Sequence, residues 1–235
     1  QTSWTDGANE IQEYIEPARK LGLKYIAITD HSKRLRVTKG LNEGLLLKQI
    51  KEIGNINNKL KKSRIDFRIL TGIECDILKD GEMDLPDGIL SKLDIVGGSI
   101  HSYFNLPRRA QTERLKRAMA NKNVDIIFHP TCRLINRRAP CDLDIDEIIS
   151  FAKSTKTVLE INGGPERLDL RDEYIRKCVE AGVKMSIDSD AHNINQIGFL
   201  DYGVSQARRG WAKKSDIINA WPLEKMKSFL KNHKP

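Results

Sequence analysis

The sequence predicts an α/β fold in which parallel strands alternate with helices. Short apolar runs alternate along the 235 residues with longer stretches whose apolar residues recur at helical spacing. The short runs are rich in Ile and Val, and most lack the polar–apolar alternation of a strand with one exposed face. Strands separated by helices pair in parallel, because each helix returns the chain to the edge where the next strand starts. Without a repeat or a linker, a single domain is expected over residues 1–235.

Six segments are expected to form strands. Each is short and apolar, as is typical of strands that are buried on both faces. In chain order they are 25–29 (YIAIT), 67–74 (FRILTGIE), 94–100 (DIVGGSI), 124–129 (VDIIFH), 158–162 (VLEIN) and 183–188 (VKMSID).

Helices are expected before, between and after these strands. Their apolar residues lie three or four positions apart, the spacing that places them on one helix face. They are 7–21, 42–62, 111–121, 142–155, 172–182 and a final helix that begins near Pro222 and runs through Phe229. Gly182 is expected to end the fifth helix. The segment 79–88 and the unusually basic segment 131–141 are expected to be loops.

The composition favours an anionic partner. The formal net charge is +8 and the isoelectric point is about 9.3, which suits nucleic acid or a phosphoester, although a lysine-rich surface alone would also account for it. No segment has the ~20 apolar residues needed to cross a bilayer, so no membrane partner is expected. The four cysteines lack C-x-x-C spacing, which argues against a zinc ribbon and favours a reduced, cytoplasmic protein.

The placement of His, Asp and Glu indicates a metal site. Four of the five histidines closely follow strand-like runs, and two acidic residues occupy the same kind of position. The carboxyl ends of parallel strands meet at one face of a barrel, so side chains there converge even when they are distant in sequence. A lone histidine after a strand is more often structural, but imidazoles and carboxylates gathered at one face are typical of a metal cluster. These residues are His31, Glu74, His101, His129, Asp190 and His192.

Two other hydrolytic chemistries lack support. The sequence has no G-x-S-x-G motif for a serine nucleophile and no Gly-rich P-loop for a nucleotide. The pattern therefore predicts a metal-dependent hydrolase.

The motifs around the six residues resemble those of the PHP family, the polymerase-and-histidinol-phosphatase metallohydrolases. They are W-T-D-G at 4–7, AITDHS at 27–32, GIECDI at 72–77, SIHS at 99–102, FHPT at 128–131, LEIN at 159–162 and SDAH at 189–192. Longer segments are similar to the C-terminal PHP domain of bacterial and archaeal family X DNA polymerases, namely HSKRLRVTKGL (31–41), HPTCRLINRRAP (129–140) and GVSQARRGW (203–211). The chain is therefore expected to be a fragment of a larger polymerase.

The resemblance implies the PHP fold, a distorted seven-stranded (β/α) TIM-like barrel, with two to three divalent metals, manganese or zinc. By this correspondence Asp6, His31 and His192 hold one metal. Glu74, His101 and His129 hold a second. Glu74 also bridges to a further metal that Asp190 binds. The expected catalytic residues are Glu74, Asp190 and Arg133, the last of which would bind the phosphate of the substrate.

The start of the chain departs from the family pattern. The family opens with an H-x-H motif at the end of its first strand. When the sequences are aligned on Trp4, the second histidine of that motif falls on Gln1. The first strand is thus expected to be truncated or missing, and a glutamine stands where an imidazole belongs.

The resemblance implies phosphoester hydrolysis at DNA ends, of the 3′-5′ exonuclease or 3′-phosphatase type, in a polymerase involved in DNA repair. The implied partners are DNA and the rest of a polymerase chain in cis, while the oligomeric state is not predicted. One alternative is a small-molecule phosphatase of the histidinol-phosphatase type, which the positive charge disfavours. Another, motivated by Gln1, is a catalytically degenerate PHP module with a structural role in the polymerase.

Basic and aromatic residues follow the predicted ligands. Arg133, Arg137 and Arg138 come soon after His129, and Arg108 and Arg109 come after His101, so a basic rim suited to a DNA backbone is expected. Tyr103 and Phe104 would either stack on a base or pack at the mouth of the barrel. Asp188 is expected to support the ligands rather than to bind metal.

Overall fold

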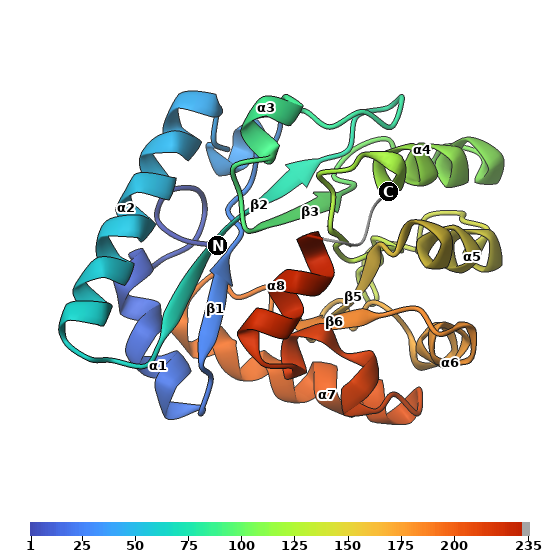
Figure 1. Cartoon of the computed structure of the whole chain (residues 1–235). Coiled ribbons are helices and arrows are strands. Elements are labelled where there is room, and N and C mark those ends of the chain that lie inside the picture. The colour runs from blue at the N-terminus through green and yellow to red at the C-terminus, as the bar shows by residue number, and fades with distance from the viewer. Residues whose placement is uncertain (232–235) are drawn as a thin grey trace.

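The computed structural model describes residues 1–231, apart from the side chain of Arg36, and contains one parallel sheet. The six strands lie in chain order across the sheet, each paired in parallel with the next (Figure 1). They are β1 (Tyr25–Ile28), β2 (Arg68–Asp76), β3 (Ile95–Ser99), β4 (Ile126–Ile127), β5 (Val158–Asn162) and β6 (Met185–Asp188). All six expected strands therefore form, although β4 keeps only two residues of the segment 124–129.

Helices surround the curled sheet (Figure 1). They are α1 (Ile15–Lys20), α2 (Glu43–Lys62), α3 (Asp87–Leu90), α4 (Arg108–Ala120), α5 (Ile145–Thr155), α6 (Asp172–Ala181), α7 (Leu200–Arg209) and α8 (Leu223–Lys231). Side-chain caps fix two of their starts, since Asn42 and Asp144 accept hydrogen bonds from backbone amides three residues on. Gly182 ends α6 with φ of 78°, as expected. Within residues 1–231, no helix is both long enough and apolar enough to cross a membrane.

Three helical segments differ from expectation. The segment 7–21 divides into a 3₁₀ turn at Ile11–Tyr14 followed by α1. The short helix α3 begins inside the expected loop 79–88. The helix α7 was not predicted, because Gly203 interrupts its short apolar stripe.

The sheet has six strands among the described residues, whereas a seven-stranded barrel was expected. β1 and β6 are the two edges of the sheet and do not pair with each other, so the sheet forms a curled half-barrel. Residues 1–10 form turns instead of a strand, because Thr2 and Thr5 donate hydrogen bonds of 2.6 Å to the Asp30 carboxylate. A cavity of about 180 Å³ lies inside the half-barrel, with residues of both edge strands and Gln1 in its lining.

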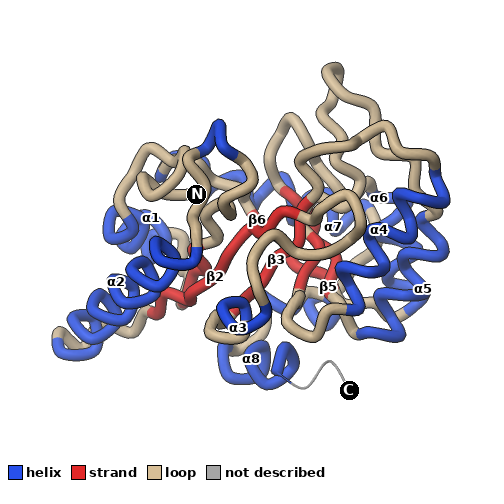
Figure 2. The backbone as a smooth tube through the Cα atoms, turned by 90° about the horizontal axis from the view of Figure 1, so that it is seen from above, coloured by secondary structure: helices blue, strands red, loops and turns tan. Residues whose placement is uncertain are grey.

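In β2 and β5 the inward-facing residues change from apolar to polar along the strand. In β2 the buried Leu70 is followed on the same face by Glu74, and in β5 Val158 is followed by Glu160 and Asn162. The apolar inward residues pack against α8, which closes the amino-terminal end of the strands. Figure 2 shows α8 at one end of the sheet and the long loops at the other. The carboxyl ends of the strands are therefore the polar end of the half-barrel.

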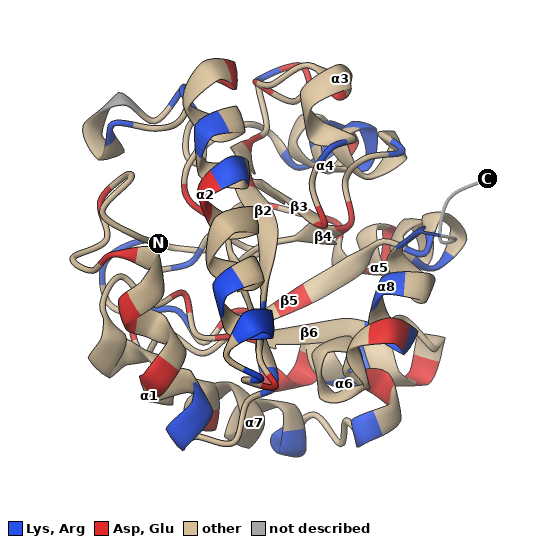
Figure 3. Ribbon diagram, turned by 60° about the vertical axis from the view of Figure 1, so that its left-hand side comes forward, with Lys and Arg blue, Asp and Glu red and all other residues tan. Residues whose placement is uncertain are grey.

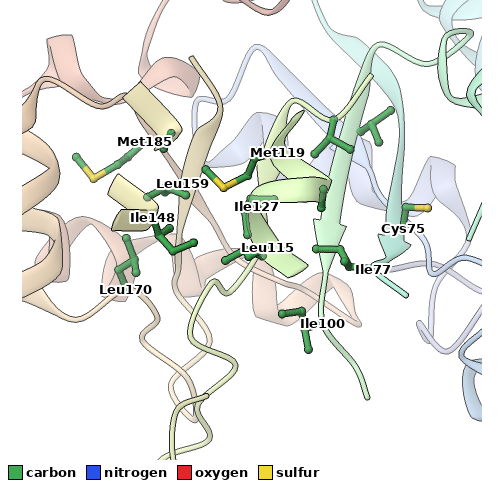
Figure 4. Close-up of a cluster of buried hydrophobic side chains, with 14 of the residues drawn as sticks. Cys75, Ile77, Ile100, Leu115, Met119, Ile127, Ile148, Leu159, Leu170 and Met185 are labelled. Atoms are coloured by element: carbon green, nitrogen blue, oxygen red, sulfur yellow. The ribbon is translucent and has the colours of Figure 1, made fainter. Parts of the chain in front are cut away.

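The opposite face of each strand packs against the helices. Ile126 points into the half-barrel, whereas the adjacent Ile127 joins the outer core. In that core Leu115 and Met119 of α4 meet Ile127, and Ile148 of α5 lies nearby (Figure 4). Both faces of the sheet are thus covered by apolar side chains, which explains the unalternating strand sequences.

Two asparagine side chains bond strand backbone on a side where no neighbouring strand pairs with it. Asn219 donates to the carbonyl of Ile187 in β6 at 2.6 Å and accepts from its amide at 3.1 Å. Asn57 of α2 makes the same two contacts with Ile69 of β2, at 2.8 and 2.9 Å. Each amide group replaces one hydrogen-bonded pair of a sheet ladder.

We expect Gly97→Ala to destabilise the fold. A Cβ at this inward position of β3 would lie 1.9 Å from Cε2 of Phe128, so the buried ring would have to move. Overpacking of this kind costs about 1–3 kcal/mol, measurable as a lower midpoint in urea unfolding. Gly54→Ala in α2 is the matched control, because nothing lies within 4 Å of its added Cβ, and it is expected to be neutral or to stabilise by up to about 1 kcal/mol. Equal midpoints for Gly97→Ala and the unchanged chain would contradict this account of the core.

Candidate metal centre

Seven side chains predicted as metal ligands come together at the carboxyl end of the sheet. Glu74 lies in β2, while the other ligands lie in loops after β1, β3, β4 and β6 or, for Asp6, in the amino-terminal turns. An isolated parallel bridge between His31 and Glu74 extends the pairing of β1 and β2 into the site. Nitrogen–oxygen distances of 3.9 Å or less connect all seven, which are Asp6, His31, Glu74, His101, His129, Asp190 and His192.

Glu74 lies at the centre of three imidazoles. Its Oε1 is 2.8 Å from Nε2 of His129 and 3.1 Å from Nε2 of His101. Its Oε2 is 3.5 Å from Nδ1 of His31, and the hydroxyl of Ser99 donates to Oε1 at 2.8 Å. Burial would raise the pKa of Glu74, but the charge of His31 and the imidazoles of His101 and His129 outweigh it and hold that pKa well below its usual range. Glu74 is therefore an ionised carboxylate in a buried site.

Asp6 forms a second group with two histidines. Its Oδ2 lies 3.8 Å from Nε2 of His31 and 3.7 Å from Nε2 of His192. Each of the sets Asp6–His31–His192 and His31–Glu74–His101 has ligand atoms within 4.8 Å of one another. His31 belongs to both sets, with Nε2 toward Asp6 and Nδ1 toward Glu74, so the two sets are adjacent.

The unsatisfied ring nitrogens fit a cation. Among the described residues, no hydrogen-bond partner is found for the buried Nδ1 of His31, Nε2 of His101 or Nδ1 of His129. Buried polar atoms are rarely left without a partner, and the first two of these nitrogens face the Glu74 carboxylate. Imidazole nitrogen and carboxylate oxygen are donors that suit zinc or manganese. The residues present therefore fit a cluster of divalent metals.

Asp76 lies two residues beyond Glu74, on the same face of β2, and orients the ring of His101. Its Oδ1 is 3.2 Å from Nδ1 of His101, so Nε2 is directed toward Glu74. A carboxylate behind a histidine fixes the ring and its tautomer in many metal sites. Burial disfavours the charged imidazole, but Asp76 and Glu74 outweigh it and raise the pKa of His101 to about 9. By contrast, burial and the charge of Arg167 lower the pKa of His129 to about 4.

Gln1 contacts the centre directly. The side-chain Nε2 of Gln1 donates to Oε2 of Glu74 at 2.7 Å, and the backbone carbonyl of Gln1 accepts from the hydroxyl of Tyr14 at 2.7 Å. Its amino group donates to the carbonyl of Ala191 at 2.8 Å. The amide of Gln1 thus occupies the oxygen of Glu74 that faces His31.

Asp190 connects the cluster to an arginine that the sequence analysis did not single out. Its Oδ2 lies 3.3 Å from Nε of Arg167 and accepts from Asn162 at 3.1 Å. The buried Nη1 of Arg167 has no partner among the described residues. In the sequence, only the position of Arg167 a few residues after the strand end LEIN could have indicated its role. Burial, with the charges of Asp188 and Asp190, raises the pKa of nearby Glu160 well above its usual range.

Arg133, predicted to bind substrate, contacts backbone instead of the cluster. Its Nε donates to the carbonyl of Arg167 at 2.7 Å, and its Nη2 donates to the carbonyl of Leu168. These bonds hold the segment that carries Arg167. Asp188, expected to support the ligands, accepts from the hydroxyl of Ser186 at 2.5 Å, and burial raises its pKa to about 6.

The rim residues behave differently from one another. Arg138 covers the ring of Phe104, with its guanidinium carbon 3.9 Å from the ring centroid, so Phe104 is a packing residue. Arg108 pairs with Asp142 at 3.0 Å. Tyr103 is 45% exposed, so its ring remains accessible at the rim.

A His–carboxylate cluster at the carboxyl ends of parallel strands is an arrangement that metal-dependent hydrolases use. The family model for the PHP domain matches residues 1–192, and the chain belongs to this family.

Two curated relatives differ in length. The chain is 46% identical over 232 residues to the DNA polymerase/3′-5′ exonuclease PolX of Bacillus subtilis, a match that covers 99% of this chain and 40% of that protein. It therefore spans less than half of that relative. It is 30% identical over 238 residues to a protein of Thermoanaerobacter named a probable phosphatase, a match that covers 95% of this chain and 89% of that protein.

A solved structure shares the fold. The histidinol phosphate phosphatase of Lactococcus lactis, in complex with zinc, L-histidinol and phosphate, superposes with a TM-score of 0.63 at 17% identity. The match covers 90% of this chain and 92% of that one.

We expect Glu74→Gln to abolish tight metal binding. The substitution removes the negative charge shared by three imidazoles. The loss should exceed the roughly 10- to 100-fold that removal of an outer-shell partner costs. Chelator-treated protein would be titrated with manganese and zinc, and bound metal counted by elemental analysis. Glu82→Gln, at an exposed loop position, is the control and should bind like the unchanged chain. Equal affinity and stoichiometry in Glu74→Gln would show that this cluster is not the metal site.

Proposed function

We propose that the chain is a metal-dependent phosphoesterase that acts on DNA ends, with 3′-5′ exonuclease or 3′-phosphatase activity. The observation that carries the proposal is the buried Glu74 carboxylate among three imidazoles, with the Asp6 group beside it. Two or three divalent metals held there, manganese or zinc, would polarise a phosphoester and activate water for in-line attack.

Different residues of the cluster would hold different metals. Glu74 would bridge, with His101 and His129 on one side, and Asp190 would bind a metal that Glu74 shares. Asp6, His31 and His192 would hold a further metal. Asp76 would keep the His101 ring in place through its 3.2 Å contact with Nδ1.

Arg167 is better placed than Arg133 to bind the substrate phosphate. Its Nε already contacts Asp190, and its free Nη1 is a donor inside the site. A planar guanidinium can give two parallel hydrogen bonds to the oxygens of a phosphate. Arg133 would then act as a positioning residue, because it holds the backbone of Arg167 and Leu168.

The DNA substrate is supported by charge and by similarity. The net charge of +8 favours a polyanion. Figure 3 shows Lys and Arg on several helices, α2 among them, so the charge is not confined to the rim. The relative at 46% identity is named a polymerase and 3′-5′ exonuclease. We infer that the chain works with the remainder of such a polymerase in cis, in DNA repair.

The test uses oligonucleotides with a labelled terminal nucleotide, ending in either a 3′-hydroxyl or a 3′-phosphate. Metal-loaded protein should release nucleotide or phosphate, and Glu74→Gln should lose at least 100-fold in rate, about 2.7 kcal/mol of transition-state stabilisation. Glu82→Gln should match the unchanged chain. Failure to release either product at full metal occupancy would refute the proposal.

A small-molecule phosphatase is the second candidate. Its support is the fold shared with the histidinol phosphate phosphatase of Lactococcus lactis and the 30% identity to a probable phosphatase. In the same assay this function requires a higher kcat/KM for histidinol phosphate than for either oligonucleotide.

A degenerate module is the third candidate, and the contact between Gln1 and Glu74 favours it. We expect Gln1→His to raise metal occupancy and hydrolysis, because an imidazole would replace an amide beside the bridging carboxylate. Gln1→Met is the control, since it keeps the length of the side chain but supplies no imidazole. If Gln1→His binds the same amount of metal as the unchanged chain and hydrolyses substrate at the same rate, Gln1 does not limit the site.

A further inference from the structure

Tyr103 is held in an exposed position beside the cluster. It lies two residues after His101, and two residues span at most about 7 Å. Its φ of 55° is in the left-handed region, which a bulky residue rarely adopts. The ring is accessible, because the residue is 45% exposed. Backbone strain that persists at a rim next to a site indicates a side chain whose position is imposed by its surroundings.

The buried Arg114 of α4 fixes the two loops that form this surface. Its Nη1 donates to the carbonyl of Ser102 at 2.9 Å, directly before Tyr103. Its Nε donates to the carbonyl of Leu78 at 2.7 Å, and its Nη2 donates to the carbonyl of Ile77. Arg114 is 2% exposed, so its three bonds hold the loops after β2 and β3 against each other. The aromatic ring is thus preorganised.

Two solvent-accessible cations lie beside the ring. The ammonium of Lys79 is 5.6 Å from the ring centroid of Tyr103, and the guanidinium carbon of Arg34 is 6.0 Å from it. These two residues, with Leu78, Asp80 and Tyr103, line a depression in the surface. Within residues 1–231, Lys79 forms no ion pair. Positive charge next to an exposed aromatic ring is the combination that binds single-stranded nucleic acid.

Arg34 connects this surface to the metal centre. Its Nε lies 3.3 Å from Oδ2 of Asp76, whose Oδ1 contacts His101. Only the carboxylate of Asp76 would then separate a phosphate bound by Arg34 from His101, a predicted metal ligand. The lining of the depression is thus connected to the cluster through Asp76.

We propose that Tyr103 stacks on the base of the nucleotide next to the scissile phosphoester, while Arg34 and Lys79 bind its backbone phosphate. This subsite rests on the proposed activity at DNA ends and deepens it, because it selects an oligonucleotide over a free phosphomonoester. Stacking does not discriminate between bases, since every base has a π face. Arg34 and Lys79 contribute charge that neither reads sequence nor contacts the reacting bond.

The binding test needs no hydrolysis. A single-stranded oligonucleotide with 2-aminopurine next to its 3′ end is titrated into the chain in EDTA, and quenching of its fluorescence reports stacking. Tyr103→Ala should abolish the quenching and weaken binding about tenfold, within the range for loss of one stacked base. Tyr103→Phe should retain both, because it keeps the ring. Tyr202→Ala is the matched control, since Tyr202 is 51% exposed and its ring contacts Phe199.

The kinetic test separates this subsite from the activity itself. Each rate on the oligonucleotide is divided by the same variant's rate on p-nitrophenyl phosphate. That ratio should fall about tenfold in Tyr103→Ala, through KM, and stay within twofold in Tyr103→Phe. Quenching by Tyr103→Ala equal to that of the unchanged chain would overturn the subsite, whatever the rates. Quenching that depends on Tyr103 without hydrolysis of either substrate would support the subsite and refute the proposed activity.

Discussion

The buried carboxylate of Glu74 is the constraint on which the site and the curl of the sheet depend. At 3% exposure, an ionised carboxylate is tolerated only where positive or hydrogen-bonding groups surround it. The imidazoles of His31, His101 and His129 do so, and they follow β1, β3 and β4. These strand ends must therefore converge around the end of β2. The amino-terminal half of the interior is apolar and closed by α8, so the polar and charged side chains of the interior are confined to the opposite end.

The charges around Glu74 are arranged in two layers. The inner layer includes ring nitrogens of His31, His101 and His129 that have no hydrogen-bond partner among the described residues. In the outer layer, carboxylates and arginines bond to the residues around them. Asp76 contacts both His101 and Arg34, and Arg133 is fastened to backbone carbonyls. Outer residues that are held rigidly keep the inner donors in place, which would lower the cost of binding a cation.

Sequence reasoning located the parts of the site that depend on strand ends. His31, His101, His129 and His192 were found because an apolar run reveals where each strand stops. The role of Asp76 was missed although it is two residues beyond Glu74, where a strand repeats its face. Arg167 was missed for a different reason, since its position depends on the path of a loop that no periodicity encodes. The seventh strand rested on resemblance alone, and residues 1–10 instead form turns that bond to Asp30.

The side chain of Asn219 has a consequence for how the molecule meets copies of itself. An open sheet exposes backbone amides and carbonyls at its edges, and such rows recruit strands from other chains. Asn219 occupies both groups of Ile187 on the edge strand β6, so a foreign strand would first have to displace a side chain that is already bonded there. The half-barrel can thus remain open beside its candidate metal centre while resisting association through the backbone of β6.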